Sequence, residues 1–131
     1  MPSRADIDPS EIATLLPHVI LLDVSHDPLD FRYRLIGTVA DAHMNEPMTG
    51  RWMSSIPYQR APSRIWSACK KTVDERIAHS SDVPYVGPKK DFVVIEDIIM
   101  PLSDDDDTVN MIFVVVDYLR LADLPPKPTG E

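Results

Sequence analysis

Four consecutive aspartates, Asp104 to Asp107, form the densest group of potential metal ligands in the sequence. A calcium loop between two helices needs oxygen ligands on alternate residues, a glycine at its sharp bend and a bidentate glutamate at the twelfth position. Counted from Asp104, the twelfth position is Val115, and no glycine lies between the two. Because the side chains of adjacent aspartates diverge and repel one another, we expect no metal site here. The aspartates instead indicate the solvated tip of a hairpin.

The other residues that could do chemistry are scattered along the chain. The histidines have no metal-ligand spacing: His18, His26, His43 and His79. Cys69 is the single cysteine, which argues against a disulfide framework or a multi-cysteine zinc site, and we expect it to be a buried apolar residue. Glu96 and Asp97 lie in a predicted strand, where neighbours point to opposite faces and cannot share a proton. Because no nucleophile motif or phosphate-binding glycine loop is present, we predict no catalytic residues and no enzymatic activity.

The composition indicates one soluble globular domain. The chain has 131 residues, of which 44% are hydrophobic and 26% are charged, with a net charge of −8. No apolar stretch approaches the roughly 20 residues needed to cross a bilayer, and the first residues lack the pattern of a signal peptide. Lysine and arginine do not cluster into the basic surface that nucleic acid requires. We expect a cytoplasmic protein that binds neither nucleic acid nor membrane.

The chain has thirteen prolines, and several of them mark the boundaries of the predicted elements, which must position any site. A short N-terminal helix is expected between Asp8, which can cap it, and Pro17, which stops it. The next two strands, residues 18–25 and 30–37, are predicted to form a hairpin around a polar turn. In the second strand, arginines alternate with apolar residues that are expected to share the packed face: Phe31, Tyr33 and Leu35.

The longest predicted helix covers residues 61–77. Its apolar residues recur at steps of three and four and fall on one side: Ile65, Trp66, Cys69, Val73 and Ile77. Charged residues fall largely on another side, so this helix should lie across a sheet. Before this helix, the pattern of residues 39–44 predicts one helical turn. His43 lies in this turn, beside apolar residues.

Three further strands are predicted in the last third of the chain: residues 83–87, 91–102 and 108–119. The two long strands should form a second antiparallel hairpin whose tip carries the aspartates. The domain prediction is therefore an N-terminal arm in residues 1–8, a domain in residues 9–119, and a proline-rich disordered tail in residues 120–131.

Particular stretches of the sequence resemble a known family. They are PSRADIDPSEIATLLPHVILLDV, DFRYRLIGT, a loop ending in PMTGRWM, and IIMPLSDD followed by TVNMI. Together with the order of the predicted elements, they resemble the PAS-fold family of short bacterial proteins, formerly known as a domain of unknown function. The resemblance covers residues 2–117. It implies an α+β fold with a five-stranded antiparallel sheet, helices on one face and an N-terminal helix.

The sequence departs from the family pattern at several positions. Asn45 stands where a glycine is common, and the glycine that usually follows the paired aspartates of the hairpin is missing. Asp97 stands where members often carry arginine. This reversed sign argues against an anion-binding role at Asp97.

The PAS resemblance implies that a small molecule or cofactor can sit between the inner face of the sheet and the long helix. The candidate wall of this cavity combines the second strand, the helical turn and the long helix: Phe31, Tyr33, Leu35, His43, Trp66 and Cys69. Core packing without a ligand is the alternative for each of them. Cys69 lacks the local sequence motif that flavin photochemistry requires. If the protein resembled the haem-binding relatives, His79 would be the candidate for the axial ligand. The cofactor is therefore left unknown.

The resemblance favours a non-enzymatic sensory or regulatory module that binds a small molecule, a signalling protein partner, or both. Two alternatives stay open: a structural interaction domain with a filled core and no ligand, and a small enzyme that uses the same cavity. A histidine, a tyrosine and an aspartate gathered in the cavity would favour the enzyme. The outer apolar side chains of the first strand and the face of the N-terminal helix are expected to be docking or homodimer surfaces.

Overall fold

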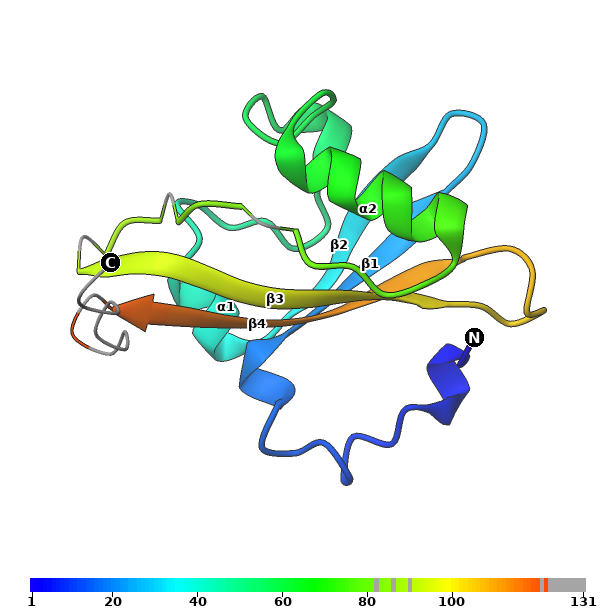
Figure 1. The fold of residues 1–131 in the computed structure, drawn as a ribbon, viewed down its shortest axis with the longest axis horizontal. Helices are drawn as coiled ribbons and strands as arrows, with labels where there is room; N and C mark the ends of the chain where they lie inside the picture. The colour runs from blue at the N-terminus through cyan, green and yellow to red at the C-terminus, as the bar shows by residue number, and fades with distance from the viewer. Residues whose placement is uncertain (82, 86, 90, 121, 123–131) are drawn as a thin grey trace, which may run out of the picture.

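A four-stranded antiparallel sheet is the centre of the fold (Figure 1). The computed structural model describes residues 1–81, 83–85, 87–89, 91–120 and 122. Its strands are β1 (Val19–Ser25), β2 (Asp30–Ile36), β3 (Phe92–Leu102) and β4 (Met111–Arg120). Its helices are α1 (Thr38–Ala42), α2 (Arg64–Glu75) and the 3-10 helices η1 (Arg4–Asp6), η2 (Leu16–His18) and η3 (Met53–Ser55). The strand order is β2-β1-β4-β3, and the fold is of the predicted α+β class.

Both predicted hairpins are confirmed. β1 pairs antiparallel with β2, and β3 pairs antiparallel with β4. β1 also pairs with β4, with Val19 opposite Val115 and Asp23 opposite Met111. The first and the last strand of the chain therefore lie side by side in the centre of the sheet.

Each face of the sheet has its own cover. Figure 1 shows α2 on one side of the sheet and the N-terminal segment, residues 1–18, on the other. The inner face, toward α2, carries a buried cluster that includes Leu22 and Phe31. The outer face carries a second cluster: Val19, Leu21, Leu102, Met111 and Phe113. Ile7 and Ile12 pack against this second cluster, so the outer side chains of β1 that were expected to form a docking surface are covered by the chain itself.

The predicted fifth strand, residues 83–87, is not a strand in the part of this segment that the structure describes. Its place beside β3 is taken by two isolated antiparallel bridges, His79 with Ile99 and Pro84 with Val94. Backbone hydrogen bonds run both ways between His79 and Ile99, at 2.9 and 2.7 Å. Because Pro84 has no N–H, it cannot donate to a ladder, and its contact with β3 stays a single bridge. Residue 86 of the predicted strand lies outside the described residues.

The predicted N-terminal helix is replaced by turns that lead into η2. Residues 9–15 form turns, and their hydrogen bonds mostly join residues three apart. Oδ1 of Asp8 accepts from the N–H and the hydroxyl of Ser10, at 2.9 and 2.8 Å, which closes a local turn. A stretch this short between two prolines does not offset the unfavourable nucleation of a helix. Packing of Ile7 and Ile12 on the outer face holds the segment in place instead.

Helix α2 contacts β3 on the inner side of the sheet. Of the residues predicted for its buried side, Cys69 is buried and Ile65, Trp66 and Val73 are half-buried, while Ala68 and Thr72, which were not predicted, are buried as well. Oγ of Ser63 caps the helix by accepting a hydrogen bond from the N–H of Trp66 at 3.1 Å. The helix ends at Arg76, whose left-handed φ of 58° redirects the chain. Ile77 therefore falls outside the helix and is 56% exposed, in contrast to its predicted place on the buried side. In the described part of the chain, no helix is long and apolar enough to cross a membrane.

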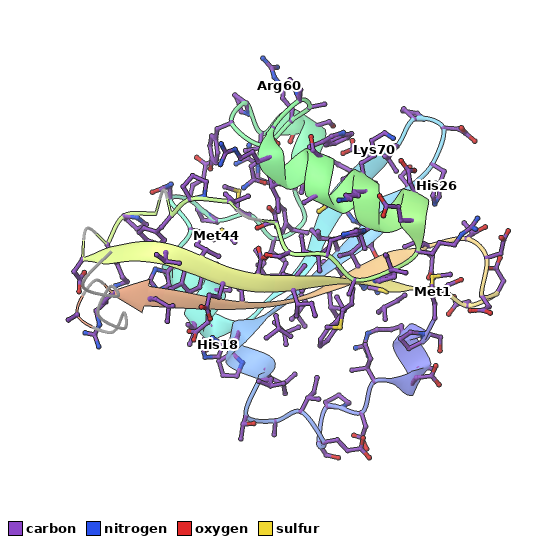
Figure 2. The ribbon with its side chains drawn as sticks, in the orientation of Figure 1. Met1, His18, His26, Met44, Arg60 and Lys70 are labelled. Atoms are coloured by element: carbon purple, nitrogen blue, oxygen red, sulfur yellow. The ribbon has the colours of Figure 1, made fainter. Side chains whose placement is uncertain are left out.

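The aspartates lie at the tip of the β3–β4 hairpin. Oδ1 of Asp105 accepts from the N–H groups of Asp107, at 2.9 Å, and Thr108, at 2.8 Å, and these bonds hold the pKa of Asp105 below its ordinary value. Asp106 has a left-handed φ of 60°, and its Oδ1 lies 2.6 Å from the amino nitrogen of Met1, which is labelled in Figure 2. Across the residues that the structure describes, no three His, Cys, Asp or Glu side chains are grouped to hold a metal ion.

We expect calcium to have no effect on the melting temperature of the wild type or of a double variant, Asp105→Asn with Asp106→Asn. A calcium ion needs about six or more oxygen ligands, and the carboxylate of Asp105 at this tip already accepts hydrogen bonds from two backbone N–H groups of the chain. Thermal unfolding in calcium and in chelator, followed by circular dichroism, measures the effect. A rise in melting temperature that calcium produces in the wild type and not in the variant would contradict the prediction.

Candidate functional site

A cavity of about 170 Å³ opens on the inner face of the sheet. Leu22 of β1 and Val114 of β4 contribute to its wall, together with Met44 and Met48 from the loop after α1. Met44 is labelled in Figure 2 and lies on the same side of the sheet as α2. The wall is mainly apolar and carries a small number of polar groups, which is the usual composition of a small-molecule site.

Aromatic side chains from three segments meet in the cavity wall. The ring of His43 stacks on that of Tyr118, with centroids 3.8 Å apart and planes inclined by 19°. The hydroxyl oxygen of Tyr85 lies 2.8 Å from Nδ1 of His43 and accepts a hydrogen bond from the N–H of Lys89 at 3.2 Å. The hydroxyl proton of Tyr85 is then available to Nδ1 of His43. In the neutral tautomer that carries its proton on Nε2, Nδ1 of His43 accepts this hydrogen bond.

The electrostatic surroundings also favour the neutral form of His43. Burial lowers its pKa below the ordinary histidine value, and the nearby charge of Lys89 lowers it further, while Asp91 acts in the opposite direction. A neutral ring that stacks on Tyr118 can serve as a flat apolar wall for a ligand.

Acidification is expected to destabilise the fold through His43. Because the folded-state pKa of His43 is lowered, the unfolded chain binds more protons as the pH falls below the ordinary histidine pKa of about 6.5. The stability that depends on a neutral His43 is therefore present above that pH and is lost as the pH falls toward the folded-state pKa. Urea unfolding on both sides of this window should show a smaller pH-dependent loss in His43→Gln than in the wild type. An equal loss in the two proteins would contradict this assignment.

Tyr33 and Asp97 add further hydrogen-bonded polar groups to the mainly apolar cavity wall. The hydroxyl of Tyr33 donates to Oε1 of Gln59 at 2.6 Å, and burial raises the pKa of Tyr33, so the hydroxyl stays protonated. Asp97 of β3 accepts from the N–H of Ser81 at 2.8 Å and from the hydroxyls of Ser80 and Ser81. The cavity thus presents fixed donors and acceptors that can orient a bound molecule.

Two residues predicted for the cavity wall, Tyr33 and His43, line the cavity. Phe31 and Cys69 are fully buried in the inner cluster and do not line it. Trp66 packs edge-to-face on Phe31, with ring centroids 5.1 Å apart and planes at 77°. Burial raises the pKa of Cys69 to about 12, so its thiol lacks the thiolate character of a reactive cysteine.

Leu35, also predicted for the cavity wall, lies on the opposite face of the sheet. Leu22 pairs with Tyr33 and Leu21 pairs with Leu35, so Arg34 is an extra residue in β2. This β-bulge shifts the register by one residue and reverses which side chains face inward. Leu35 therefore joins Leu21 on the outer face and is 42% exposed.

His79, the candidate for a haem ligand, is not among the residues that line the cavity. Its backbone bridges Ile99 of β3, and its Nε2 lies 3.4 Å from Oε1 of Glu75 at the end of α2. The side chain of His79 therefore lies beside the end of α2 and is not part of the cavity wall.

Sequence analysis did not assign Asp97, Tyr85 or Tyr118 to the cavity. For Asp97 a signal was present, because it shares one face of β3 with Ile95 and Ile99, and a charged residue within the apolar set of a strand is unusual. Tyr118 follows the same alternation in β4. Tyr85 comes from a segment without a periodic pattern, so its position depends on tertiary packing alone.

Comparisons with known proteins agree with this architecture. A model of the PAS domain family matches residues 1–116. The fold is similar to the crystal structure of a sensory box sensor histidine kinase from Vibrio cholerae, with a TM-score of 0.58, 14% sequence identity, and coverage of 86% of this chain and 90% of that chain. No match to a curated protein was found. The chain therefore belongs to the PAS domain family, whose members are generally sensory and signalling modules.

Proposed function

We propose that this PAS domain is a non-enzymatic sensory module that binds a small molecule in the inner-face cavity and signals through a protein partner. The cavity of about 170 Å³ is the observation that carries the proposal. It is far larger than the roughly 30 Å³ that a water molecule occupies in the liquid. An apolar cavity of about 150 Å³ can bind benzene, so a ligand with a single ring fits the available volume.

The segment on the far side of the cavity gives a route from ligand to partner. Ser81, Val83 and Tyr85 line the cavity, while the backbone pairing of this segment with β3, among the described residues, consists of two isolated bridges. A segment held by few ladder bonds can change position at a smaller energetic cost than a strand. A ligand that contacts this segment would move it from one position to another only if the ligand bound the two positions with different affinities. A signalling protein that binds this segment would then sense the ligand.

An enzyme is the second candidate function, because the structure gathers a histidine, tyrosines and an aspartate in one cavity. His43, Tyr85, Tyr118 and Asp97 all line it. Several features favour binding over catalysis. Nδ1 of His43 is engaged by Tyr85, and burial raises the pKa of Tyr118, so neither group is prepared to accept or release a proton near neutral pH.

A structural interaction domain with a filled core is less consistent with a cavity of this volume. The expectations of a cytoplasmic location and of a homodimer remain predictions from the sequence. Native mass spectrometry addresses both the ligand and the subunit count, because it reports a retained small molecule and the mass of the assembly together.

Filling the cavity is expected to weaken the binding of single-ring probes. Val116 lines the cavity and is 5% exposed, so Val116→Phe should place a ring in the space that a ligand needs. Calorimetric titration with benzyl alcohol and benzylamine should show affinity lowered by about tenfold or more, which corresponds to about 1.4 kcal/mol. Ile98→Phe is the matched control, because Ile98 is 44% exposed and lies on the outer face. Equal binding by both variants and the wild type would contradict the cavity as the binding site.

A further inference from the structure

The charges around the cavity are unbalanced. Asp97 is the one carboxylate among the described residues that line it, and none of those lining residues is lysine or arginine. His43 is neutral in the arrangement described above. Lys89 is exposed and does not line the cavity, and its influence on His43 is opposed by that of Asp91. The described part of the cavity wall therefore carries net negative charge.

The charge of Asp97 is not neutralised by a cation in the described part of the chain. The three hydrogen bonds that it accepts from described residues all come from neutral groups, the N–H of Ser81 and the hydroxyls of Ser80 and Ser81. No ion pair joins it to a described lysine, arginine or histidine. An ionised carboxylate offers about four acceptor positions, so about one remains open. A half-buried carboxylate in a mainly apolar cavity is stabilised most by a positively charged partner.

The aromatic lining suits the same kind of partner. Four tyrosines line the cavity: Tyr33, Tyr58, Tyr85 and Tyr118. The face of an aromatic ring attracts a cation, and ammonium ligands are recognised by groups of such rings. Burial raises the pKa of Tyr33, Tyr58 and Tyr118, so these rings stay uncharged and act through their faces and hydroxyl groups.

We infer that the cavity selects a small organic cation, with its ammonium group at Asp97 and its apolar body among the tyrosines and the aliphatic residues of β1 and β4. The inference rests on the proposed ligand-binding function and adds the charge of the ligand. A protonated amine matches the open acceptor position of Asp97 better than a quaternary ammonium, because it can donate a hydrogen bond. An anion would face an uncompensated carboxylate, and its binding is disfavoured.

A matched series of single-ring probes tests this inference at neutral pH. Benzylamine is cationic, benzyl alcohol is neutral and benzoate is anionic, while the ring is the same. In calorimetric titrations of the wild-type protein, we expect benzylamine to bind at least tenfold more tightly than benzyl alcohol, and benzoate to show no binding. Asp97→Asn should lower the affinity for benzylamine to that for benzyl alcohol. Glu96→Gln is the control, because it removes one negative charge from the neighbouring position on the opposite face of β3 and should keep the wild-type preference.

The outcomes separate this inference from the proposed function. Equal binding of benzylamine and benzyl alcohol, or tighter binding of benzoate, would overturn the selection of a cation and leave the cavity as a ligand site. A preference for benzylamine that persists in Asp97→Asn would overturn the role of Asp97. Failure of all three probes to bind, together with no retained molecule in native mass spectrometry, would overturn the proposed function itself. Because the probe series uses the wild-type protein, a variant that fails to fold does not prevent the test.

Discussion

Phe31→Ala is expected to lower the free energy of unfolding by about 3–5 kcal/mol, the range for removing a fully buried aromatic side chain. Phe31 is 0% exposed and belongs to the inner cluster. Its ring also meets Trp66 edge-to-face, a contact that contributes about 0.5–1.5 kcal/mol beyond the buried area. The alanine variant would lose both the burial of the ring and its contact with Trp66, and it would leave a cavity under α2. Urea unfolding monitored by the fluorescence of Trp66 and Trp52 measures the change.

Leu35→Ala provides the comparison for Phe31→Ala. Both residues lie in β2, and both were expected to share the packed face, but Leu35 is 42% exposed on the outer side. We expect its substitution to lower the free energy of unfolding by less than about 1 kcal/mol. Similar losses of unfolding free energy in the two variants would contradict the different burial that the bulge at Arg34 gives to Phe31 and Leu35.

Gly37→Ala is expected to destabilise the protein by about 3 kcal/mol because a Cβ atom has no room at this position. That atom would lie 2.2 Å from the carbonyl oxygen of Leu16 and 2.5 Å from that of Pro17. Both are backbone atoms, so the clash cannot be relieved by rotating a side chain. The N–H of Gly37 also donates to the carbonyl oxygen of Val19 at 2.7 Å, which ties the end of β2 to the start of β1. Thermal and urea unfolding would both report the loss.

Gly50→Ala tests whether the effect at Gly37 comes from crowding. Gly50 has a left-handed φ of 87°, but a Cβ atom there would meet no atom within 4 Å. Alanine at Gly50 therefore carries conformational strain of about 1–2 kcal/mol and no clash. A larger loss at Gly50 than at Gly37 would contradict the close approach of Gly37 to the chain at Leu16 and Pro17.

The elements with strong periodic patterns could be predicted from the sequence. The two hairpins follow from runs of β-branched residues around polar turns, and α2 follows from apolar residues at steps of three and four. The segments that differ from prediction are short and rich in proline. Residues 9–17 and the described residues 78–81, 83 and 84 take their conformation from contacts with the sheet, since local propensity alone is too weak to fix it.

The candidate site could be predicted only in part, for two physical reasons. First, the alternation in β2 placed Tyr33 correctly and Leu35 incorrectly, because the bulge at Arg34 depends on pairing with β1 and leaves no mark on the pattern of apolar residues. Second, Tyr85 lines the cavity although it is far from Tyr118 in sequence, and the two rings approach each other through tertiary packing. Asp97 was noticed as a reversal of sign within the family resemblance, and the structure adds that it lines the cavity.

The position of β4 between β1 and β3 has a consequence for synthesis of the protein. The β1–β2 hairpin leaves the ribosome well before its neighbour β4 is made. Until β4 is synthesised, the edge of β1 that carries Ile20 and Leu22 has no strand to pair with. Pairings between distant parts of a chain also slow folding, because the intervening loop must close first. We expect a chaperone that shields apolar strands to raise the yield of this protein more than that of a helical protein of similar length.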